Sequence, residues 1–174
     1  MLGIKMFKAV PKLLLVEDDP DQMDLLLQFV LDEIRALSKN PNISDEKKEM
    51  LSAIKILKAN NIESLRIAVS RYKDIFLAVL DCNLPDNKTS SPNDQLVKTS
   101  HRITGQHYGV DILNDNLPSV PITLISSKYR FKKIVYEYYE SQYGLNITFI
   151  KKSDHDTIQR NIGYHLRRLI SEQG

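Results

Sequence analysis

Four short apolar runs constrain the fold of this chain more than any other feature. They cover residues 12–16, 75–81, 120–126 and 146–151, and each is almost continuously hydrophobic. Strands of this kind are typical of a parallel sheet that helices cover on both faces. A fifth run, 53–59, alternates more between polar and apolar residues, so we expect it nearer an edge of the sheet.

Segments with helical spacing separate these runs. The expected helices cover residues 21–37, 62–72, 109–115, 130–143 and 154–170. Strands that alternate with helices in this way predict an open α/β sheet with right-handed crossover connections.

The composition limits the class of protein. A chain of 174 residues with 42% hydrophobic residues is long enough for one domain with a sizeable core. The single cysteine, Cys82, excludes an internal disulfide, and the formal charge of +2 gives no reason to expect nucleic acid as a partner. No apolar run approaches the roughly 20 residues of a membrane-spanning helix, and the first residues do not form a convincing signal peptide. We therefore expect a cytoplasmic protein without a membrane partner.

Polar side chains gather where the apolar runs end. Because parallel strands place their carboxyl ends on one rim of the sheet, these side chains are expected to lie together. The groups in question are Glu17, Asp18 and Asp19 after the first run, Asp81 in another, then Ser126 with Ser127, and Lys151 with Lys152. The acidic triplet alone is better explained by a solvated turn whose carboxylates favour the start of the following helix. Together with Asp81, its carboxylates suit a hard cation such as Mg²⁺.

The order of these motifs resembles the receiver domains of two-component response regulators, which are CheY-like. The stretches that carry the resemblance are "LLLVEDDP", "ANNIESL", "AVLDCNLPD", "VPITLISS" and "FIKKS". The resemblance implies a three-layer, doubly wound, flavodoxin-like α/β fold with five parallel strands in the order 2-1-3-4-5. It also implies one stand-alone receiver domain at 12–173, after an N-terminal extension at 1–11.

The same resemblance implies roles for the acidic residues. Asp81 would be the phosphoacceptor, which takes a phosphoryl group from a histidine kinase or a histidine phosphotransfer protein. Glu17, Asp18, Asp81 and the backbone carbonyl of Asn83 would hold Mg²⁺, whereas Asp19 is more simply a helix-start residue. The protein would therefore be a signalling receiver and not an enzyme with turnover.

Three further residues receive roles from the resemblance. Lys152 would pair with the phosphoryl oxygens, Ser126 would hydrogen-bond the phosphoryl group, and Phe149 would take the place of the aromatic switch residue. Lys151 remains an alternative to Lys152, because receivers usually have proline after the lysine and this chain has Ser153. Downstream output is expected through protein contacts on the face built by 128–170, where tyrosines are frequent.

The chain departs from the family in two stretches. Residues 38–52 lengthen the first crossover and suggest an extra helical turn, and residues 86–108 form a polar, turn-rich insertion beside the expected phosphoacceptor. Two alternatives stay open. The first is a receiver-like scaffold that works without phosphate. The second is a Mg²⁺-dependent phosphohydrolase, which is less favoured because Asn83 stands where such enzymes carry a second aspartate.

Overall fold

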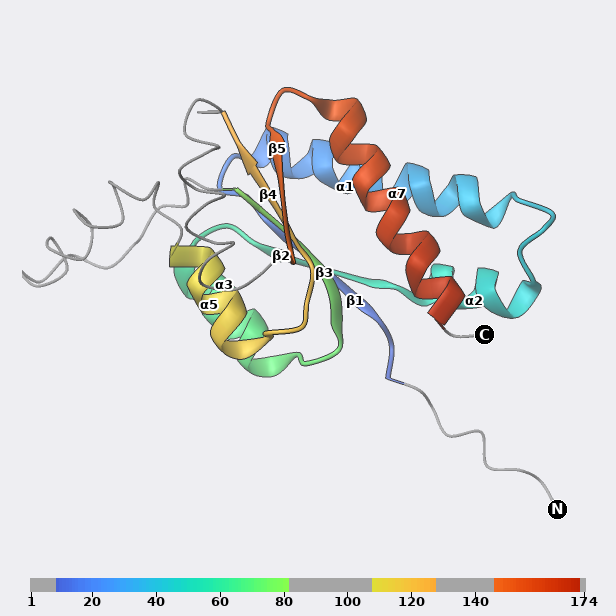
Figure 1. Ribbon diagram of the computed structural model, residues 1–174, viewed down its shortest axis with the longest axis horizontal. Coiled ribbons are helices and arrows are strands. Elements are labelled where there is room, and N and C mark those ends of the chain that lie inside the picture. The colour runs from blue at the N-terminus through green and yellow to red at the C-terminus, as the bar shows by residue number, and fades with distance from the viewer. Residues whose placement is uncertain (1–8, 82–107, 128–145, 173–174) are drawn as a thin grey trace, which may run out of the picture.

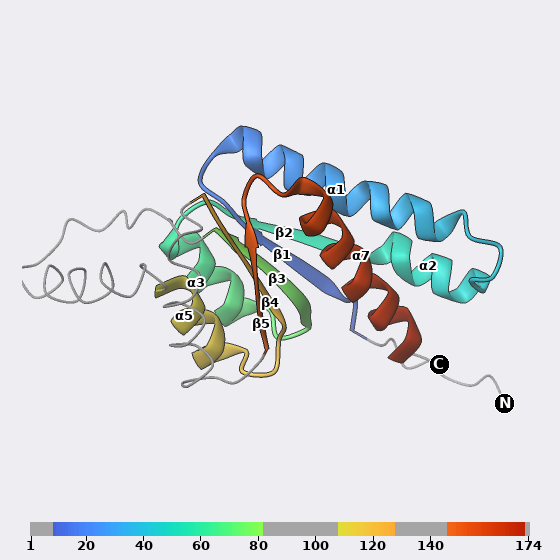
Figure 2. The same ribbon diagram turned by 45° about the horizontal axis from the view of Figure 1, so that its top comes forward.

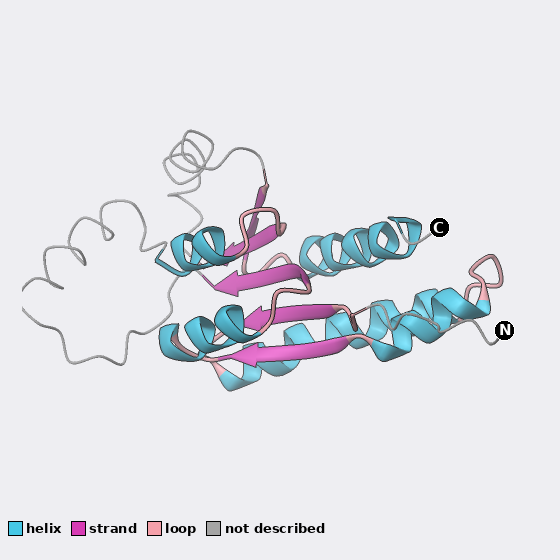
Figure 3. Cartoon of the chain, turned by 90° about the horizontal axis from the view of Figure 1, so that it is seen from below, coloured by secondary structure: helices cyan, strands magenta, loops and turns pink. Residues whose placement is uncertain are grey.

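A five-stranded parallel sheet forms the centre of the computed structural model, which describes residues 9–81, 108–127 and 146–172 (Figure 1). The strands are β1 (Lys12–Val16), β2 (Lys55–Ala59), β3 (Ile75–Asp81), β4 (Ile122–Ser126) and β5 (Ile147–Lys151). They lie in the order β2-β1-β3-β4-β5, and every neighbouring pair is parallel; Figure 3 shows this twisted sheet from below, with helices on both of its faces. The predicted fold class and strand order are confirmed, and β2 occupies an edge as its alternating pattern indicated.

Helices cover both faces of this sheet. They are α1 (Pro20–Ser38), α2 (Asp45–Ala53), α3 (Ile62–Arg71), α5 (Tyr108–Asn116) and α7 (His155–Glu172). Helices α1, α2 and α7 lie on one face and α3 with α5 on the other, which both Figure 1 and Figure 2 show. Four of the five expected helices match these bounds within two residues. The fifth, at 130–143, lies outside the described residues.

Each strand supplies side chains to two separate cores, one on each face of the sheet. In β1, Leu14 and Val16 face the α3/α5 side, whereas Leu13 and Leu15 face the α1/α7 side. The period of two in a strand produces this division, and it explains why the strands are apolar almost throughout. The same alternation determines toward which face of the sheet the side chains just beyond the strand ends project.

One buried polar contact ties β4 to α7. Thr123 is fully buried on the α1/α7 side of β4, and its hydroxyl donates a hydrogen bond to the side-chain oxygen of Asn161 in α7. This bond satisfies a hydroxyl that would otherwise be desolvated without a partner, so it fixes α7 against the sheet.

The first crossover contains more structure than one helical turn. Helix α2 spans nine residues, and Leu51 is 1% exposed on its inner side, within the core that α1 and α7 share. The insertion at 38–52 therefore extends the hydrophobic layer over one face of the sheet. The second predicted insertion, 86–108, lies outside the described residues except for Tyr108, the first residue of α5. Among the described helices, none is both long and apolar enough to cross a membrane.

Candidate functional site

The carboxyl ends of β1, β3, β4 and β5 meet at one rim of the sheet. Val16 lies opposite Leu80 in the β1–β3 pair, and Ser126 lies opposite Lys151 in the β4–β5 pair. Glu17 follows directly after β1, and Asp81 is the last residue of β3. The polar strand ends therefore meet at a single rim, as the sequence indicated.

Alternation along the strands decides which of these side chains meet. Glu17, Asp81 and Lys152 each lie two residues beyond a side chain of the α1/α7 core, namely Leu15, Val79 and Ile150. All three therefore project toward the same face. Lys151 falls on the opposite parity and is exposed at the end of β5.

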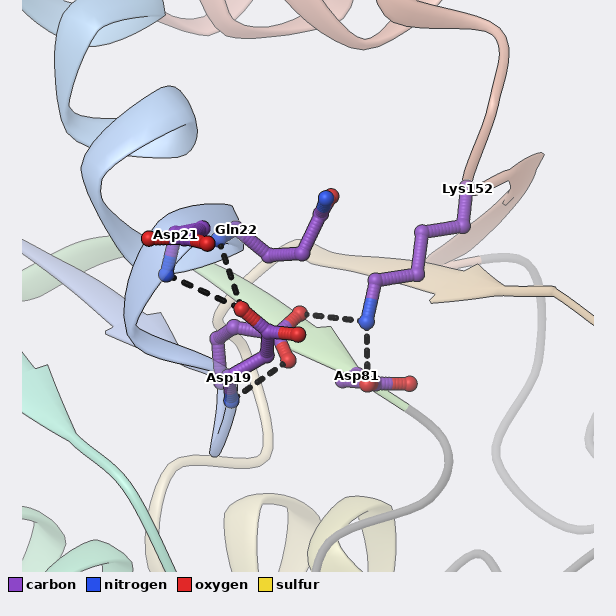
Figure 4. A network of polar contacts seen from close by, with 6 residues as sticks. Asp19, Asp21, Gln22, Asp81 and Lys152 are labelled. Atoms are coloured by element: carbon purple, nitrogen blue, oxygen red, sulfur yellow. Dashed lines mark hydrogen bonds and ion pairs between the residues drawn. The ribbon is translucent and has the colours of Figure 1, made fainter.

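A single ammonium group bridges the two buried carboxylates. Lys152 Nζ lies 2.8 Å from Asp81 Oδ2, with which it forms a hydrogen bond, and 2.8 Å from Glu17 Oε2, with which it forms an ion pair. Figure 4 shows the lysine side chain reaching down from the end of β5 to Asp81. Glu17 is 1% exposed and Asp81 is 4% exposed. Charges buried to this extent need such a partner.

Glu17 is the most strongly perturbed titrating group of the described site. Burial raises its pKa to about 7 from an ordinary value of 4.5, and the nearby Asp81 carboxylate adds to the rise. The Lys152 side chain and the backbone N–H of Asp19, which donates to Glu17 Oε1 at 3.1 Å, lower the pKa in part. Near neutral pH this site therefore holds a carboxyl group that readily takes up or loses a proton.

Lys152 stays positively charged in these surroundings. Burial alone would lower its pKa, but hydrogen bonding and charge from Asp81 and Glu17 outweigh burial and raise it. Its backbone N–H donates to the carbonyl of Ser126 at 2.9 Å, which joins the ends of β4 and β5. Lys152 is therefore held at both its backbone and its ammonium group.

The residues after Glu17 divide between two tasks. Asp19 caps α1, since its Oδ1 accepts hydrogen bonds from the backbone N–H groups of Asp21 (2.9 Å) and Gln22 (3.1 Å), and Pro20 is the first helical residue (Figure 4). This geometry agrees with the helix-start role expected of Asp19. Asp18 is exposed, and its carboxylate belongs to the acidic group with Glu17 and Asp81.

The carboxylates of Glu17, Asp18 and Asp81 form a group suited to a cation. One oxygen from each lies within 4.8 Å of the others. Hard oxygen donors of this kind are the ligands of Mg²⁺, which needs only one or two protein carboxylates and keeps several waters. The residues present therefore fit a Mg²⁺ ion. The fourth expected ligand, the carbonyl of Asn83, lies outside the described residues.

The fold of the chain is similar to that of solved receiver structures. The bacteriophytochrome response regulator AtBRR superposes with a TM-score of 0.54 at 16% identity over 92% of this chain and 94% of its own. The signal receiver domain of an HD domain-containing protein from Pseudomonas fluorescens Pf-5 gives 0.53 at 16% identity over 99% and 98%. The N-terminal domain of a response regulator/sensory box/GGDEF 3-domain protein from Carboxydothermus hydrogenoformans gives 0.51 at 11% over 94% and 99%. The chain has the response regulator receiver fold.

Sequence comparisons add no closer relationship. Neither a protein-family model nor a curated protein sequence matches this chain. The receiver fold is thus established through its structure, while the chemistry of the site must be argued from this chain's own residues.

Within the receiver fold, the two expected switch residues lie on neighbouring strands. Ser126 is the last residue of β4 and is 4% exposed, whereas Ser127 lines an open hollow beside Lys152. Phe149 is 6% exposed in the α3/α5 core, directly opposite Leu124. Ser126 therefore lies at the rim on the strand next to the one that carries Asp81, whereas Phe149 lies one strand further away, two residues before the end of β5.

The open hollow next to Lys152 also contains residues that the sequence analysis did not single out. Gln22 from the first turn of α1 and His155 from the first residue of α7 line it, together with Asp19, Ser127 and Ser153. The His155 ring lies 5.7 Å from the ring of Phe29 in α1. The sequence could have indicated both residues, because each lies at the start of a helix that directly follows a strand of the rim, and such helices begin at the same end of the sheet.

Proposed function

We propose that this chain is a phosphorylation-gated signalling receiver whose phosphoacceptor is Asp81. The observation that carries the proposal is the placement of Lys152 between the buried carboxylates of Asp81 and Glu17, 2.8 Å from each. The receiver fold of the structural neighbours supports it. Under this proposal the chain modifies itself and has no turnover on a separate substrate.

Asp81 is suited to act as the nucleophile. One of its oxygens accepts a hydrogen bond from Lys152, which orients the carboxylate at the rim. A lone pair on a carboxylate oxygen of Asp81 would attack the phosphorus of a phosphohistidine. The phosphorus–nitrogen bond would break, the imidazole would leave with the bonding pair and take up a proton, and an acyl phosphate would remain on Asp81.

The charge of the transferred group requires compensation from the surrounding residues. Lys152 would exchange its contact with the carboxylate for one with the phosphoryl oxygens, and the Ser126 hydroxyl would donate a hydrogen bond to them. Mg²⁺, when bound by Asp18 and Asp81 with Glu17 acting through water, would neutralise phosphoryl charge during transfer. Glu17 keeps Lys152 in place through its ion pair.

The proposed signal leaves the site through β4 and β5. Ser126 and Phe149 lie on these adjacent strands, and the formation of a hydrogen bond to a phosphoryl group would favour one of two pre-existing arrangements. A histidine kinase or a histidine phosphotransfer protein is the proposed donor. A downstream protein is the proposed target, contacting the face that 128–170 contributes, within a cytoplasmic setting.

Phosphoryl transfer can be tested by intact mass measurement. Wild type, Asp81→Asn and Asp18→Asn would be incubated with acetyl phosphate, with and without Mg²⁺. The proposal predicts one phosphoryl addition to the wild type, which chelation removes and which Asp81→Asn abolishes. Asp18→Asn keeps the acceptor but weakens the cation site, so it should require more Mg²⁺. Addition to Asp81→Asn at the wild-type level would reject Asp81 as the acceptor.

The same experiment separates the two alternatives. A folded wild type that accepts no phosphoryl group from acetyl phosphate or from a phosphorylated histidine phosphotransfer domain would be a phosphate-independent scaffold. Continuous release of phosphate from p-nitrophenyl phosphate would instead indicate a phosphohydrolase. Asn83 argues against the second outcome, because an amide cannot exchange a proton with the leaving group as a carboxyl can.

A further inference from the structure

A second cavity lies at the opposite end of the sheet from Asp81. It is formed where β3, β4 and β5 begin and where α7 ends, and its volume is about 370 Å³. Lys73 and Phe76 line it from the β3 side, and His165, Arg168 and Leu169 line it from α7. Ile75 is the first residue of β3, and Pro121 and Asn146 directly precede β4 and β5, so the cavity is separate from the rim that carries the proposed phosphoacceptor.

The cavity is large enough for a small organic molecule, and its lining is divided between apolar and polar side chains. Pockets that bind such ligands usually exceed about 300 Å³ and combine an apolar wall with a few polar groups. Here Ile75, Phe76, Val120 and Leu169 supply the apolar wall. An apolar body would gain from leaving water in this place.

His165 is the polar group most confined to the cavity. It is 9% exposed, and within residues 9–81, 108–127 and 146–172 no group is hydrogen-bonded to its ring. Its ring meets that of Tyr164 at 5.1 Å in an edge-to-face arrangement, which fixes its orientation. Burial, assisted by the charge of Arg168, lowers its pKa, so the ring is neutral at neutral pH and offers one donor and one acceptor.

The charged groups around the cavity favour an anion. Arg168 donates through Nε to Glu172 Oε1 at 2.6 Å, and Lys73 donates to the backbone carbonyl of Val69 at 2.7 Å. A guanidinium has five N–H donors and an ammonium has three, so these bonds leave further donors on both side chains for an acceptor. Glu172 is the one acidic residue among the described residues that line the cavity. Two cations against one carboxylate leave a positive balance.

We propose that this cavity binds a small organic monoanion with an apolar, preferably aromatic, body. The apolar part would pack on Phe76 and Leu169, and the carboxylate would accept from Arg168 and Lys73 while the His165 ring contacts its edge. The site is independent of the proposed phosphoryl chemistry, because none of its residues belongs to the Asp81 rim. A ligand bound here would contact α7 and the starts of β3, β4 and β5, and could therefore change the position of elements whose other ends lie at that rim.

Benzoate is a suitable probe, and benzyl alcohol is its neutral counterpart of similar size. Benzoate would be titrated into the unphosphorylated 174-residue chain while the His165 ring nitrogens and the Leu169 methyl groups are followed by NMR. We expect saturable shifts at both residues with a dissociation constant on the order of 1 mM, as a ligand of this size allows. Benzyl alcohol should bind at least about fivefold more weakly, because it forms no charge-assisted hydrogen bond.

Two variants on α7 make the test specific. Arg168→Gln should weaken benzoate binding about fivefold and leave benzyl alcohol unchanged, because its exposed side chain carries the charge and little of the packing. Arg160→Gln is the matched control, since Arg160 is an exposed arginine of the same helix that does not line the described cavity. Equal affinity for the two probes, equal losses in the two variants, or the absence of saturable shifts at His165 would each overturn the proposal.

Discussion

The buried carboxyl group of Glu17 makes the stability of the protein depend on pH in a predictable direction. Its pKa in the folded state is about 7, compared with 4.5 ordinarily. The folded state therefore holds a proton more tightly than the unfolded chain between these values, and the free energy of unfolding falls as pH rises through this window. Each tenfold difference in proton affinity is worth about 1.4 kcal/mol, so ionised Glu17 costs the folded state up to about 3 kcal/mol at pH 8.

Replacement of Glu17 by glutamine should remove this cost. The amide keeps the size of the protonated side chain and has no charge to desolvate. We expect Glu17→Gln to be about 2–3 kcal/mol more stable than the wild type at pH 8 and nearly equal to it at pH 4.5. Urea unfolding in the presence of a chelator at several pH values measures both free energies, with m-values compared to verify two-state behaviour.

A control variant separates the buried site from the general effect of net charge. Asp24→Asn removes one carboxylate from the exposed side of α1 and should leave the difference between pH 4.5 and pH 8 close to that of the wild type. If the curves of Glu17→Gln and the wild type stay parallel from pH 4.5 to pH 8, the burial argument for Glu17 is refuted. A variant that is less stable at pH 8 would show that the ion pair with Lys152 outweighs desolvation.

The remaining predictions concern charge, metal and the buried polar contact. Lys152→Met leaves Glu17 and Asp81 without their shared cation and should destabilise the protein by about 2–4 kcal/mol at pH 8 and by less at pH 5, as urea unfolding measures. Mg²⁺ at ten times its dissociation constant should raise the free energy of unfolding by about 1.4 kcal/mol, and Asp18→Asn should reduce this gain in the same assay. Asn161→Leu leaves the Thr123 hydroxyl buried without a partner and should cost about 1–3 kcal/mol, and Thr123→Val added to it should recover part of the loss. Equal costs for the single and double variants would contradict that account.

Sequence patterns predicted the sheet well because its strands depend on short-range hydrophobicity. The continuous apolar character of Leu13–Val16 and Ile75–Leu80 follows from two-sided burial, and the structure has both strands where they were expected. Helix α2 was underestimated for the opposite reason. Its segment is mostly charged and contributes one fully buried side chain, Leu51, so its helical form depends on packing against α1 and α7 that no local pattern displays.

The site was predicted as a set of strand ends, but its geometry required the register. The choice between Lys151 and Lys152 could not be made from motif spacing, because Ser153 replaces the usual proline. The alternation that links Ile150 to Lys152 carried the needed signal, since Asp81 and Glu17 follow the same parity on their own strands. The raised pKa of Glu17 could not be predicted from sequence, because it depends on how deeply the rim is buried.

The hydrogen bond between Thr123 and Asn161 limits how α7 can move. It anchors the helix at one point in its middle third, on the strand that ends in Ser126. Sliding of the helix along the sheet would separate the two groups and leave the Thr123 hydroxyl desolvated. Rotation of α7 about this point preserves the bond. One end of the helix lies beside the rim that carries Asp81 and the other lines the second cavity, so a small rotation about this contact would move the two ends in opposite directions.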